Sequence, residues 1–339
     1  MVLIYVESLD ASYDNAQLFG RNLLSALEAP ALGGVSFNHY NQAPGTGWTM
    51  AAIVATQCGV PLEPITLYDG NVQGEKLKHF LPDAVCLGDV LDKFGYRNIF
   101  MGGVNLDFAG KGRFLQDHHY AEVYGRDEWL DRGETLADMV GWGLRDDALF
   151  RHAKTKLDAL EASGQRFNLT LLTLDTHYPG PPVLSDYCRQ RGVKNYADLV
   201  ACTADQVADF VGYIRARGYL KNTDVVVLGD HLPMTNPIDD KLKTIPDPER
   251  HIFNLFVGQN APRKNREQIV HFDLLPTILD FVGVHVSHMR LALGYSGFAP
   301  EVPLLANNRL AEMRSNLTHP SPIYFDLWKQ ANEAHSSAG

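Results

Sequence analysis

Three residues at the ends of apolar runs have side chains that bind metal ions. Glu7 follows the run 2–6, and Asp230 and His231 follow the run 224–228. A carboxylate and an imidazole that stand side by side at the end of a strand can turn toward one ion, and this pair of donors suits Mn²⁺, Zn²⁺ or Mg²⁺. A structural interpretation is also open, in which Asp230 caps the next loop and His231 is half-buried.

Thr49 has the position and the chemistry of a nucleophile. It follows the turn-rich loop 42–48 and precedes a stretch in which Met50, Ile53 and Val54 share one helical face. At a helix N-terminus the backbone N–H groups and the helix dipole favour an anion such as a phosphoryl group. A threonine hydroxyl beside a metal ion can lose its proton and attack. Threonine is also a common helix cap, so a purely structural role is the alternative.

The elements that must position these residues are short apolar runs that alternate with amphipathic stretches. The runs predict strands over 2–6, 98–101, 169–174, 224–228 and 252–257. The amphipathic stretches predict helices over 16–27, 85–94, 146–162, 196–217 and 272–282. This alternation favours one α/β domain with a mostly parallel sheet that helices cover on both faces.

Ligands of an open α/β sheet lie beyond the carboxyl ends of its strands. The polar residues at the predicted strand ends are therefore expected on one rim. They are Glu7, the loop residues Asn105 and Asp107, the pair Asp175 and His177, and the pair Asp230 and His231.

The composition is that of a globular protein with enough apolar material for a large core. Of 339 residues, 45% are hydrophobic and 21% are charged. Because the net charge is −10, from 40 acidic and 30 basic residues, a chain-wide nucleic-acid surface is excluded. No window approaches about 18 apolar residues, so no transmembrane helix is expected here. The first residues lack the basic region of a signal peptide. We expect a single domain over 1–339, with the segment 291–339 packed on it.

The four cysteines leave the redox state open. Cys58, Cys86, Cys188 and Cys202 form no C-x-x-C motif, which disfavours a zinc ribbon or a thioredoxin-like site. Their even number permits two disulfides in an oxidising compartment. Four buried thiols in a cytosolic protein are the alternative.

Taken in order, the motifs resemble the phosphoglycerol transferases. These enzymes form the branch of the alkaline phosphatase and sulfatase superfamily that includes lipoteichoic acid synthase, and the likeness is greatest to the group that decorates osmoregulated periplasmic glucans. It extends over about 3–298, and its motifs are the segments 5–9, 44–49, 57–61, 86–89, 176–177, 229–231 and 294–297. The resemblance implies an alkaline phosphatase-like three-layer α/β/α domain with a mostly parallel central sheet.

The resemblance also implies roles for individual residues. Glu7, Thr49, Asp230 and His231 match the ligands of one divalent metal, expected to be Mn²⁺ with Mg²⁺ or Zn²⁺ as alternatives. Thr49 matches the nucleophile as well, and His177 matches a histidine that protonates the leaving oxygen or holds a phosphoryl oxygen. A looser match places substrate contacts at Trp48, Asn105, Asp107, Lys111 and Arg113. Trp48 fits equally well as ordinary packing.

The implied reaction moves phosphoglycerol from a phosphatidylglycerol-type lipid to sugar hydroxyls of a periplasmic glucan through a phosphoglycerol-threonine intermediate. The setting would be the membrane surface in the periplasm, for a soluble protein or the soluble part of an inner-membrane protein. Because Glu7 lies so close to Met1, we expect a truncated chain. In that compartment, disulfides Cys58–Cys86 and Cys188–Cys202 are expected.

Differences from related families narrow the choice of branch within the superfamily. Sulfatases use cysteine or serine where Thr49 stands, and two-metal phosphatases need a second ligand set that is not evident around Asp230. The phosphoethanolamine transferases continue their Asp-His pair with Gly-Glu-Ser, but here Leu232 follows. Two alternatives stay open: a phosphodiesterase or phosphatase with the same residues, and a carbohydrate-binding module without turnover.

Overall fold

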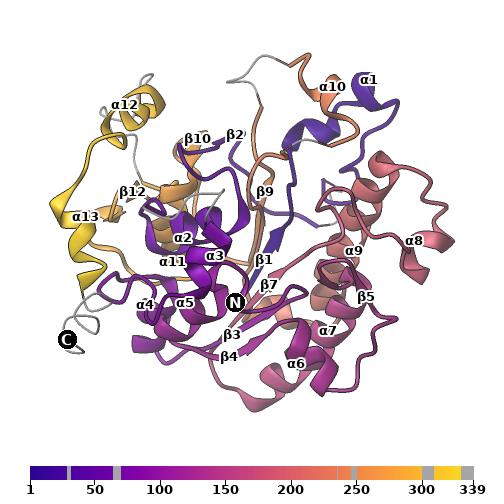
Figure 1. Cartoon of the computed structure of the whole chain (residues 1–339), viewed down its shortest axis with the longest axis horizontal. Coiled ribbons are helices and arrows are strands. Elements are labelled where there is room, and N and C mark those ends of the chain that lie inside the picture. The colour runs from indigo at the N-terminus through magenta and orange to yellow at the C-terminus, as the bar shows by residue number, and fades with distance from the viewer. Residues whose placement is uncertain (29–31, 64–69, 235, 246–249, 300–308, 330–339) are drawn as a thin grey trace.

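The computed structural model describes residues 1–28, 32–63, 70–234, 236–245, 250–299 and 309–329. A six-stranded sheet in the order β4-β3-β7-β1-β8-β9 forms its centre (Figure 1). The first five strands are parallel and β9 is an antiparallel edge. The strands are β1 (Val2–Val6), β3 (Arg97–Gly102), β4 (Tyr120–Tyr124), β7 (Phe167–Leu172), β8 (Val225–Gly229) and β9 (Asn254–Val257).

Helices cover both faces of this sheet, because the central strands are apolar on both sides. On β1, Val2, Ile4 and Val6 pack in the core beneath α7 (Asp146–Ser163) and α9 (Tyr196–Ala216). Leu3 and Tyr5, which alternate with them, pack in the second core. That core lies under α2 (Thr49–Cys58), α4 (Leu87–Lys93) and α11 (Leu274–Phe281), on the left of the sheet in Figure 1. The result is three layers.

Shorter elements fill the connections between these layers. The helical ones are η1 (Ala11–Asp14), α1 (Ala16–Phe19), α3 (Gly70–Glu75), η2 (Phe108–Gly110), α5 (Lys111–Asp117), α6 (Arg126–Asp131), α8 (Asp186–Gln190), η3 (Tyr219–Lys221), α10 (Asp239–Leu242), η4 (His271–Asp273) and η5 (Ser287–Met289). Three two-stranded pairs join β2 (His39–Asn41) with β10 (Gln268–Val270), β5 (Met139–Val140) with β6 (Gly143–Leu144), and β11 (Arg290–Leu291) with β12 (Gly294–Tyr295).

The helix predicted over 16–27 is wrong in length. Only α1 forms, because Gly20 takes a left-handed conformation with φ of 78° and ends the helix after Phe19. The other predicted strands and helices lie within two residues of their expected bounds. Strand β4 was not predicted, since its sequence Tyr-Ala-Glu-Val-Tyr mixes exposed and buried positions at the sheet edge.

Both expected disulfides are present. Cys58–Cys86 joins the C-terminal end of α2 to the residue that caps α4, and Cys188–Cys202 joins α8 to α9. The first therefore connects the helix that begins at Thr49 to its neighbour in the same layer. The second lies on the other face of the sheet.

The described part of the C-terminal segment contacts the rest of the chain. Helix α12 (Arg309–Asn316) contributes Leu310 and Met313 to a small cluster with Phe272. After α13 (Pro322–Asp326), the Trp328 ring lies 5.4 Å from the Phe80 ring. Among the helices in the described ranges, none combines the length and the hydrophobicity needed to cross a bilayer.

Candidate active site

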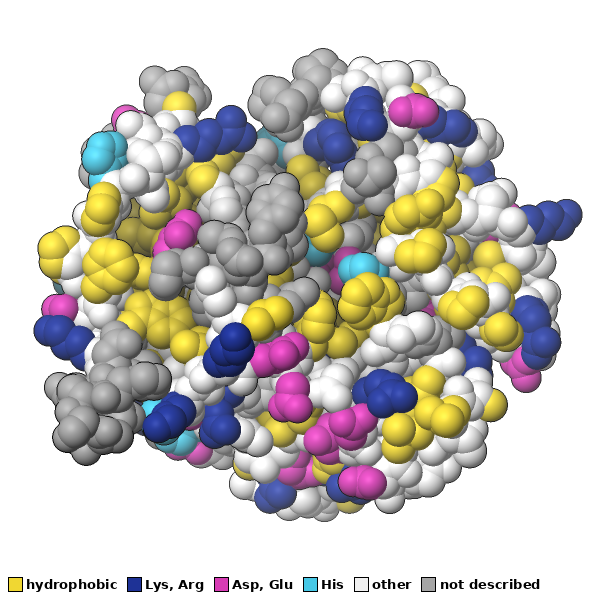
Figure 2. Space-filling model, viewed as in Figure 1, with side chains coloured by type: hydrophobic (Ala, Val, Ile, Leu, Met, Phe, Trp, Pro, Cys, Tyr) yellow, Lys and Arg dark blue, Asp and Glu magenta, His cyan; other side chains and the backbone are white. Residues whose placement is uncertain are grey.

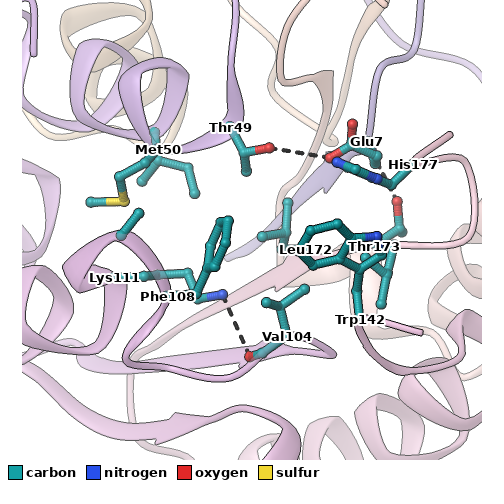
Figure 3. A pocket seen from close by; sticks show the side chains of 13 residues that line it. Glu7, Thr49, Met50, Val104, Phe108, Lys111, Trp142, Leu172, Thr173 and His177 are labelled. Atoms are coloured by element: carbon teal, nitrogen blue, oxygen red, sulfur yellow. Dashed lines mark hydrogen bonds between the residues drawn. The ribbon is translucent and has the colours of Figure 1, made fainter. Parts of the chain in front are cut away.

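Two neighbouring strands and one helix bring four reactive side chains together. Glu7 follows β1, Asp230 and His231 follow β8, and Thr49 begins α2. The Thr49 hydroxyl donates to Glu7 Oε2 at 3.2 Å (Figure 3) and lies 3.5 Å from His231 Nε2. His231 Nε2 lies 3.7 Å from Glu7 Oε1 and 3.5 Å from Asp230 Oδ2. These four residues are called the ligand cluster below.

Hydrogen bonds from the backbone fix the orientation of the cluster. Asp230 Oδ1 accepts the N–H groups of Ser8 and His231, both at 2.8 Å. The Ser8 hydroxyl donates to Glu7 Oε1 at 2.7 Å. His231 Nδ1 donates to the Leu232 carbonyl at 2.8 Å, which leaves the lone pair of Nε2 facing the other donors. Ser8 holds a left-handed φ of 55°, a strain that is typical of functional strand ends.

The cluster concentrates negative charge in a buried place. Burial, followed by the charge of Glu7, raises the pKa of Asp230 to about 7. Burial lowers the pKa of His231, but the charges of Asp230 and Glu7 outweigh this, so its pKa lies above the ordinary value. A cation bound among these groups would relieve the repulsion between the two carboxylates.

His271 anchors the loop before Thr49 to this strand end. Its Nε2 donates to the Asp230 carbonyl at 2.7 Å, and its Nδ1 accepts the Ala43 N–H at 3.2 Å. Burial lowers the pKa of His271 to about 3, so the ring is neutral and keeps both bonds. These contacts give His271 a structural role.

A cavity of about 60 Å³ opens beside Glu7 and Thr49. Its walls are mostly apolar, and Figure 3 shows them facing Thr49. On the far side lies Lys111, only 4% exposed, whose ammonium reaches the Val104 carbonyl at 3.5 Å. Burial lowers the pKa of Lys111 to about 8. The remaining lining residues are Met50, Ile53, Phe108, Ala109, Trp142, Leu172, Thr173, Leu174 and His177.

His177 and Trp142 form the outer wall of this cavity. Their ring centroids are 5.2 Å apart, and Trp142 also meets Phe108 at 5.8 Å. Nδ1 of His177 is buried and makes no hydrogen bond within the described ranges. Trp142 is 47% exposed, unlike the other tryptophans, so its ring stands at the cavity mouth. Figure 2 shows yellow side chains around a histidine near the centre of this face.

The predicted substrate contacts divide into two groups. Lys111 lines the cavity with Thr49 and His177. Trp48 is buried in the core under α2, and Asn105 bonds Asp127 and the Asp107 N–H in a surface turn. Asp107 and Arg113 are exposed and lie outside the cavity lining.

Trp142 and Phe108 were missed by reasoning from strand ends. Trp142 lies in the turn between β5 and β6, and a bridge between Val104 and Gly143 holds this hairpin against the end of β3. A Cβ at Gly143 would lie 1.9 Å from the Gly103 carbonyl oxygen, so the contact needs glycine. In the sequence, the only indication of this contact is the Gly-Trp-Gly triplet at 141–143, which is typical of a tight turn that presents an aromatic ring.

The ligand cluster fits a divalent metal. Glu7, Asp230 and His231 each offer one donor atom, and these atoms lie within 4.8 Å of one another. Asp230 Oδ2 is buried and lacks a hydrogen-bond partner among the described residues. Two carboxylates, an imidazole and a hydroxyl are donors that Mn²⁺, Mg²⁺ and Zn²⁺ accept.

Curated relatives share much of this sequence. Phosphoglycerol transferase I from Salmonella paratyphi B is 39% identical over 241 residues, which make up 70% of this chain and 31% of the relative. The protein of the same name from Salmonella typhi gives the same values. The chain thus spans less than a third of the length of these relatives.

Solved structures share the fold. A protein in the alkaline phosphatase superfamily from Vibrio parahaemolyticus has a TM-score of 0.69 at 20% identity and covers 89% of this chain and 70% of its own. Lipoteichoic acid synthase LtaP from Listeria monocytogenes has a TM-score of 0.68 at 16% identity, covering 88% and 74%. Streptococcus pyogenes phosphoglycerol transferase GacH, solved with sn-glycerol-1-phosphate, has a TM-score of 0.57 at 14% identity, covering 99% and 88%.

The layered sheet and these neighbours define an α/β protein with an alkaline phosphatase-like fold, as predicted. The family model described as Sulfatase matches residues 1–284, and the chain belongs to the sulfatase family. The resemblance to phosphoglycerol transferases is confirmed by the curated relatives.

Proposed function

We propose that the chain carries the catalytic site of a metal-dependent phosphoglycerol transferase. The observation that carries this proposal is the Thr49 hydroxyl, held at a helix N-terminus within 3.2 Å of a Glu7 carboxylate oxygen and 3.5 Å of His231 Nε2. A hydroxyl among metal donors, open to a cavity, is the arrangement of an activated nucleophile. The names of the curated relatives supply the transferred group.

In the first half-reaction, the Thr49 oxygen, ionised to the alkoxide, attacks the phosphorus of a phosphatidylglycerol-type donor. The new bond joins Thr49 to phosphoglycerol, and the bond between phosphorus and the diacylglycerol oxygen breaks. His177, which lines the same cavity, donates the proton that this leaving oxygen needs. In the second half-reaction, a glucan hydroxyl returns a proton to His177 and attacks phosphorus, which releases Thr49 as the alkoxide.

Glu7, Asp230, His231 and Thr49 would hold the metal, expected to be Mn²⁺. When bound, such an ion lowers the pKa of the threonine hydroxyl and offsets charge on the phosphoryl oxygens. The chain itself keeps the four donors oriented through the backbone hydrogen bonds of Ser8 and His231.

Lys111 supplies positive charge on the other side of the cavity. Among the described residues, its ammonium contacts the Val104 carbonyl at 3.5 Å and the Phe100 ring, whose centroid lies 5.9 Å away, and it is nearly enclosed. A phosphoryl oxygen in the cavity would complete its hydrogen bonding and restore its ordinary pKa. The apolar walls between Lys111 and Thr49 exclude water that would compete with the acceptor.

The acceptor and the compartment extend the proposal. A periplasmic glucan is the acceptor that the sequence resemblance implies, and an oxidising compartment is what two disulfides require to persist. Because the donor is a lipid, the reaction takes place at the membrane surface. Water in place of the sugar would give slow hydrolysis.

Intact-protein mass spectrometry tests this function directly. The protein is incubated with Mn²⁺ and phosphatidylglycerol vesicles, with Thr49→Ala and Thr155→Ala as variants. Thr155 is an exposed threonine of α7 outside the cavity. Wild type and Thr155→Ala should gain one phosphoglycerol, Thr49→Ala none. If diacylglycerol is released without an adduct, and added glucan does not become the acceptor of the phosphoglycerol group, the protein is a hydrolase instead. If neither an adduct nor diacylglycerol release is detected, this donor is excluded.

A further inference from the structure

The loop that carries His177 is held by a buried carboxylate from another element. Strand β7 ends at Leu172, and the chain turns at 174–177, where the His177 N–H donates to the Leu174 carbonyl at 2.8 Å. Asp146, the first residue of α7, lies directly behind this turn. Its Oδ1 accepts the Leu174 N–H at 2.7 Å and its Oδ2 accepts the Asp175 N–H at 3.1 Å.

The contact is reciprocal and completely enclosed. The Asp146 N–H donates to Asp175 Oδ1 at 3.4 Å, so two backbone segments exchange side-chain hydrogen bonds. Asp146 is 0% exposed and Asp175 is 1% exposed. Burial raises the pKa of Asp146 well above the ordinary range, and it raises that of Asp175 to about 7. Two acids in one apolar place are costly to fold, and such groups concentrate at functional sites.

The same turn is fixed to the ligand cluster. The Thr176 hydroxyl donates to the Glu7 carbonyl at 2.6 Å, and the Tyr196 hydroxyl donates to the Thr176 carbonyl at 2.6 Å. Thr176 therefore sets the distance between the His177 loop and Glu7. Asp146 restricts the conformational freedom that the loop still has, because its carboxylate accepts both N–H groups at the start of the turn.

We propose that Asp146 is a positioning residue for His177. It fixes the turn 174–177 so that the imidazole faces the leaving oxygen in the cavity that Thr49 also lines. The inference rests on the proposed function, in which His177 protonates that oxygen. Helix α7 contributes no residue to the cavity lining, and in this proposal its first residue controls proton transfer by His177.

Two phosphoglycerol donors with different leaving groups separate positioning from general stability. p-Nitrophenol leaves without a proton, whereas the alcohol of phosphatidylglycerol needs one. In the first turnover, before the second half-reaction needs His177 as a base, His177→Ala should slow transfer from the lipid donor about 10²–10³-fold and leave p-nitrophenol release within a few-fold of wild type. Asp146→Ala should show the same selectivity, about tenfold on the lipid donor, mainly in the first-turnover rate constant rather than in donor affinity. The double variant should be no slower than His177→Ala.

Asp273→Ala is the matched control, since Asp273 is also fully buried and accepts the N–H groups of Val270 and Tyr295. It should affect both donors equally. Asp146→Asn, which keeps one acceptor oxygen, should fall between wild type and Asp146→Ala and provides a folded variant if the alanine variant unfolds.

Equal slowing of both donors by the Asp146 variants would overturn the proposal and leave Asp146 a structural residue. If His177→Ala itself shows no dependence on the leaving group, the role of His177 in the proposed function is wrong, and the positioning role is wrong with it. The two failures are distinguishable because each variant is compared with both donors.

Discussion

Two groups of polar residues at the cavity are built in opposite ways. In the ligand cluster, Glu7, Asp230 and His231 are buried, and nearly every polar atom has a backbone or side-chain partner. Within the described ranges, the Lys111 ammonium contacts only the Val104 carbonyl and the Phe100 ring, and His177 Nδ1 makes no hydrogen bond. The ligand cluster lacks partners at the atoms that would face a metal ion. Lys111 and His177 lack partners that the oxygens of a bound substrate would supply.

This contrast separates what is preorganised from what awaits substrate. Residues of the ligand cluster are fixed by the ends of β1 and β8, so changing one should disturb metal binding and the nucleophile together. Lys111 and His177 come from separate segments of the chain, so each should contribute its own, smaller share of the activity. Four substitutions test this order of effects.

Asp230→Asn should have the largest effect. It removes one charge from the cluster while keeping the Ser8 and His231 N–H bonds to an oxygen. We expect loss of tight Mn²⁺ binding and a fall in transfer rate of at least about 10³-fold. Bound metal is measured by elemental analysis after dialysis, beside the activity. An Asp230→Asn protein with full metal content and activity would remove Asp230 from the ligand set.

Lys111→Met should come second and affect activity and stability in opposite directions. Loss of a charged hydrogen bond to phosphate should lower kcat/KM about 10–100-fold. Because burial lowers the pKa of Lys111 to about 8, the unfolded chain holds this proton more tightly. Burial of the protonated Lys111 therefore lowers the free energy of unfolding by its full amount below pH 8. This destabilisation decreases as the pH rises toward the ordinary pKa of lysine.

The stability of Lys111→Met should thus exceed that of wild type by up to about 3 kcal/mol at pH 7. The gain should shrink steadily above pH 8. Denaturant titrations at several pH values measure it, with the exposed Lys93→Met as control. A pH-independent difference would show that the Lys111 amine is not held in a desolvated place.

Much of this fold follows from the sequence, because β1 and β8 are uninterrupted apolar runs with polar residues directly after them. Such runs predict buried parallel strands, and parallel strands bring Glu7 and Asp230 to one edge. The same reasoning does not find strand β4, since three of its five residues are not buried. The helix predicted from Ala16 ran too far because amphipathic spacing continued past Gly20, whose backbone ends it.

The far wall of the cavity was harder to foresee. Lys111 was placed there through the resemblance, while Asn105 and Arg113 from the same loop turn outward. Which residue of a loop faces inward depends on turns such as the left-handed Ala109, with φ of 56°, that no periodicity reveals. Trp142 and Asp146 reach the site through tertiary contacts with distant segments. The roles of all these residues stay predictions until they are measured.

Trp142→Ala should have a smaller effect than Lys111→Met. The ring is half exposed and touches His177 and Phe108 at the cavity mouth. Loss of these ring contacts should cost about threefold to tenfold in kcat/KM, with little change in melting temperature. Trp142→Phe should restore most of the activity. If the alanine variant has wild-type kinetics, the exposed ring does not contribute to substrate binding or turnover.

Arg113→Ala should have the smallest effect, and its value lies in the contrast with Lys111. Both are basic residues of α5, two positions apart, yet Arg113 is exposed and Lys111 is enclosed beside the cavity. An exposed charge outside the cavity should change stability by no more than about 0.5 kcal/mol and leave kcat/KM nearly unchanged. Steady-state kinetics on both variants at two salt concentrations makes the comparison. If Arg113→Ala lowered kcat/KM as much as Lys111→Met, the positive charge that matters would lie on the rim, and the substrate would be bound by long-range attraction rather than inside the cavity.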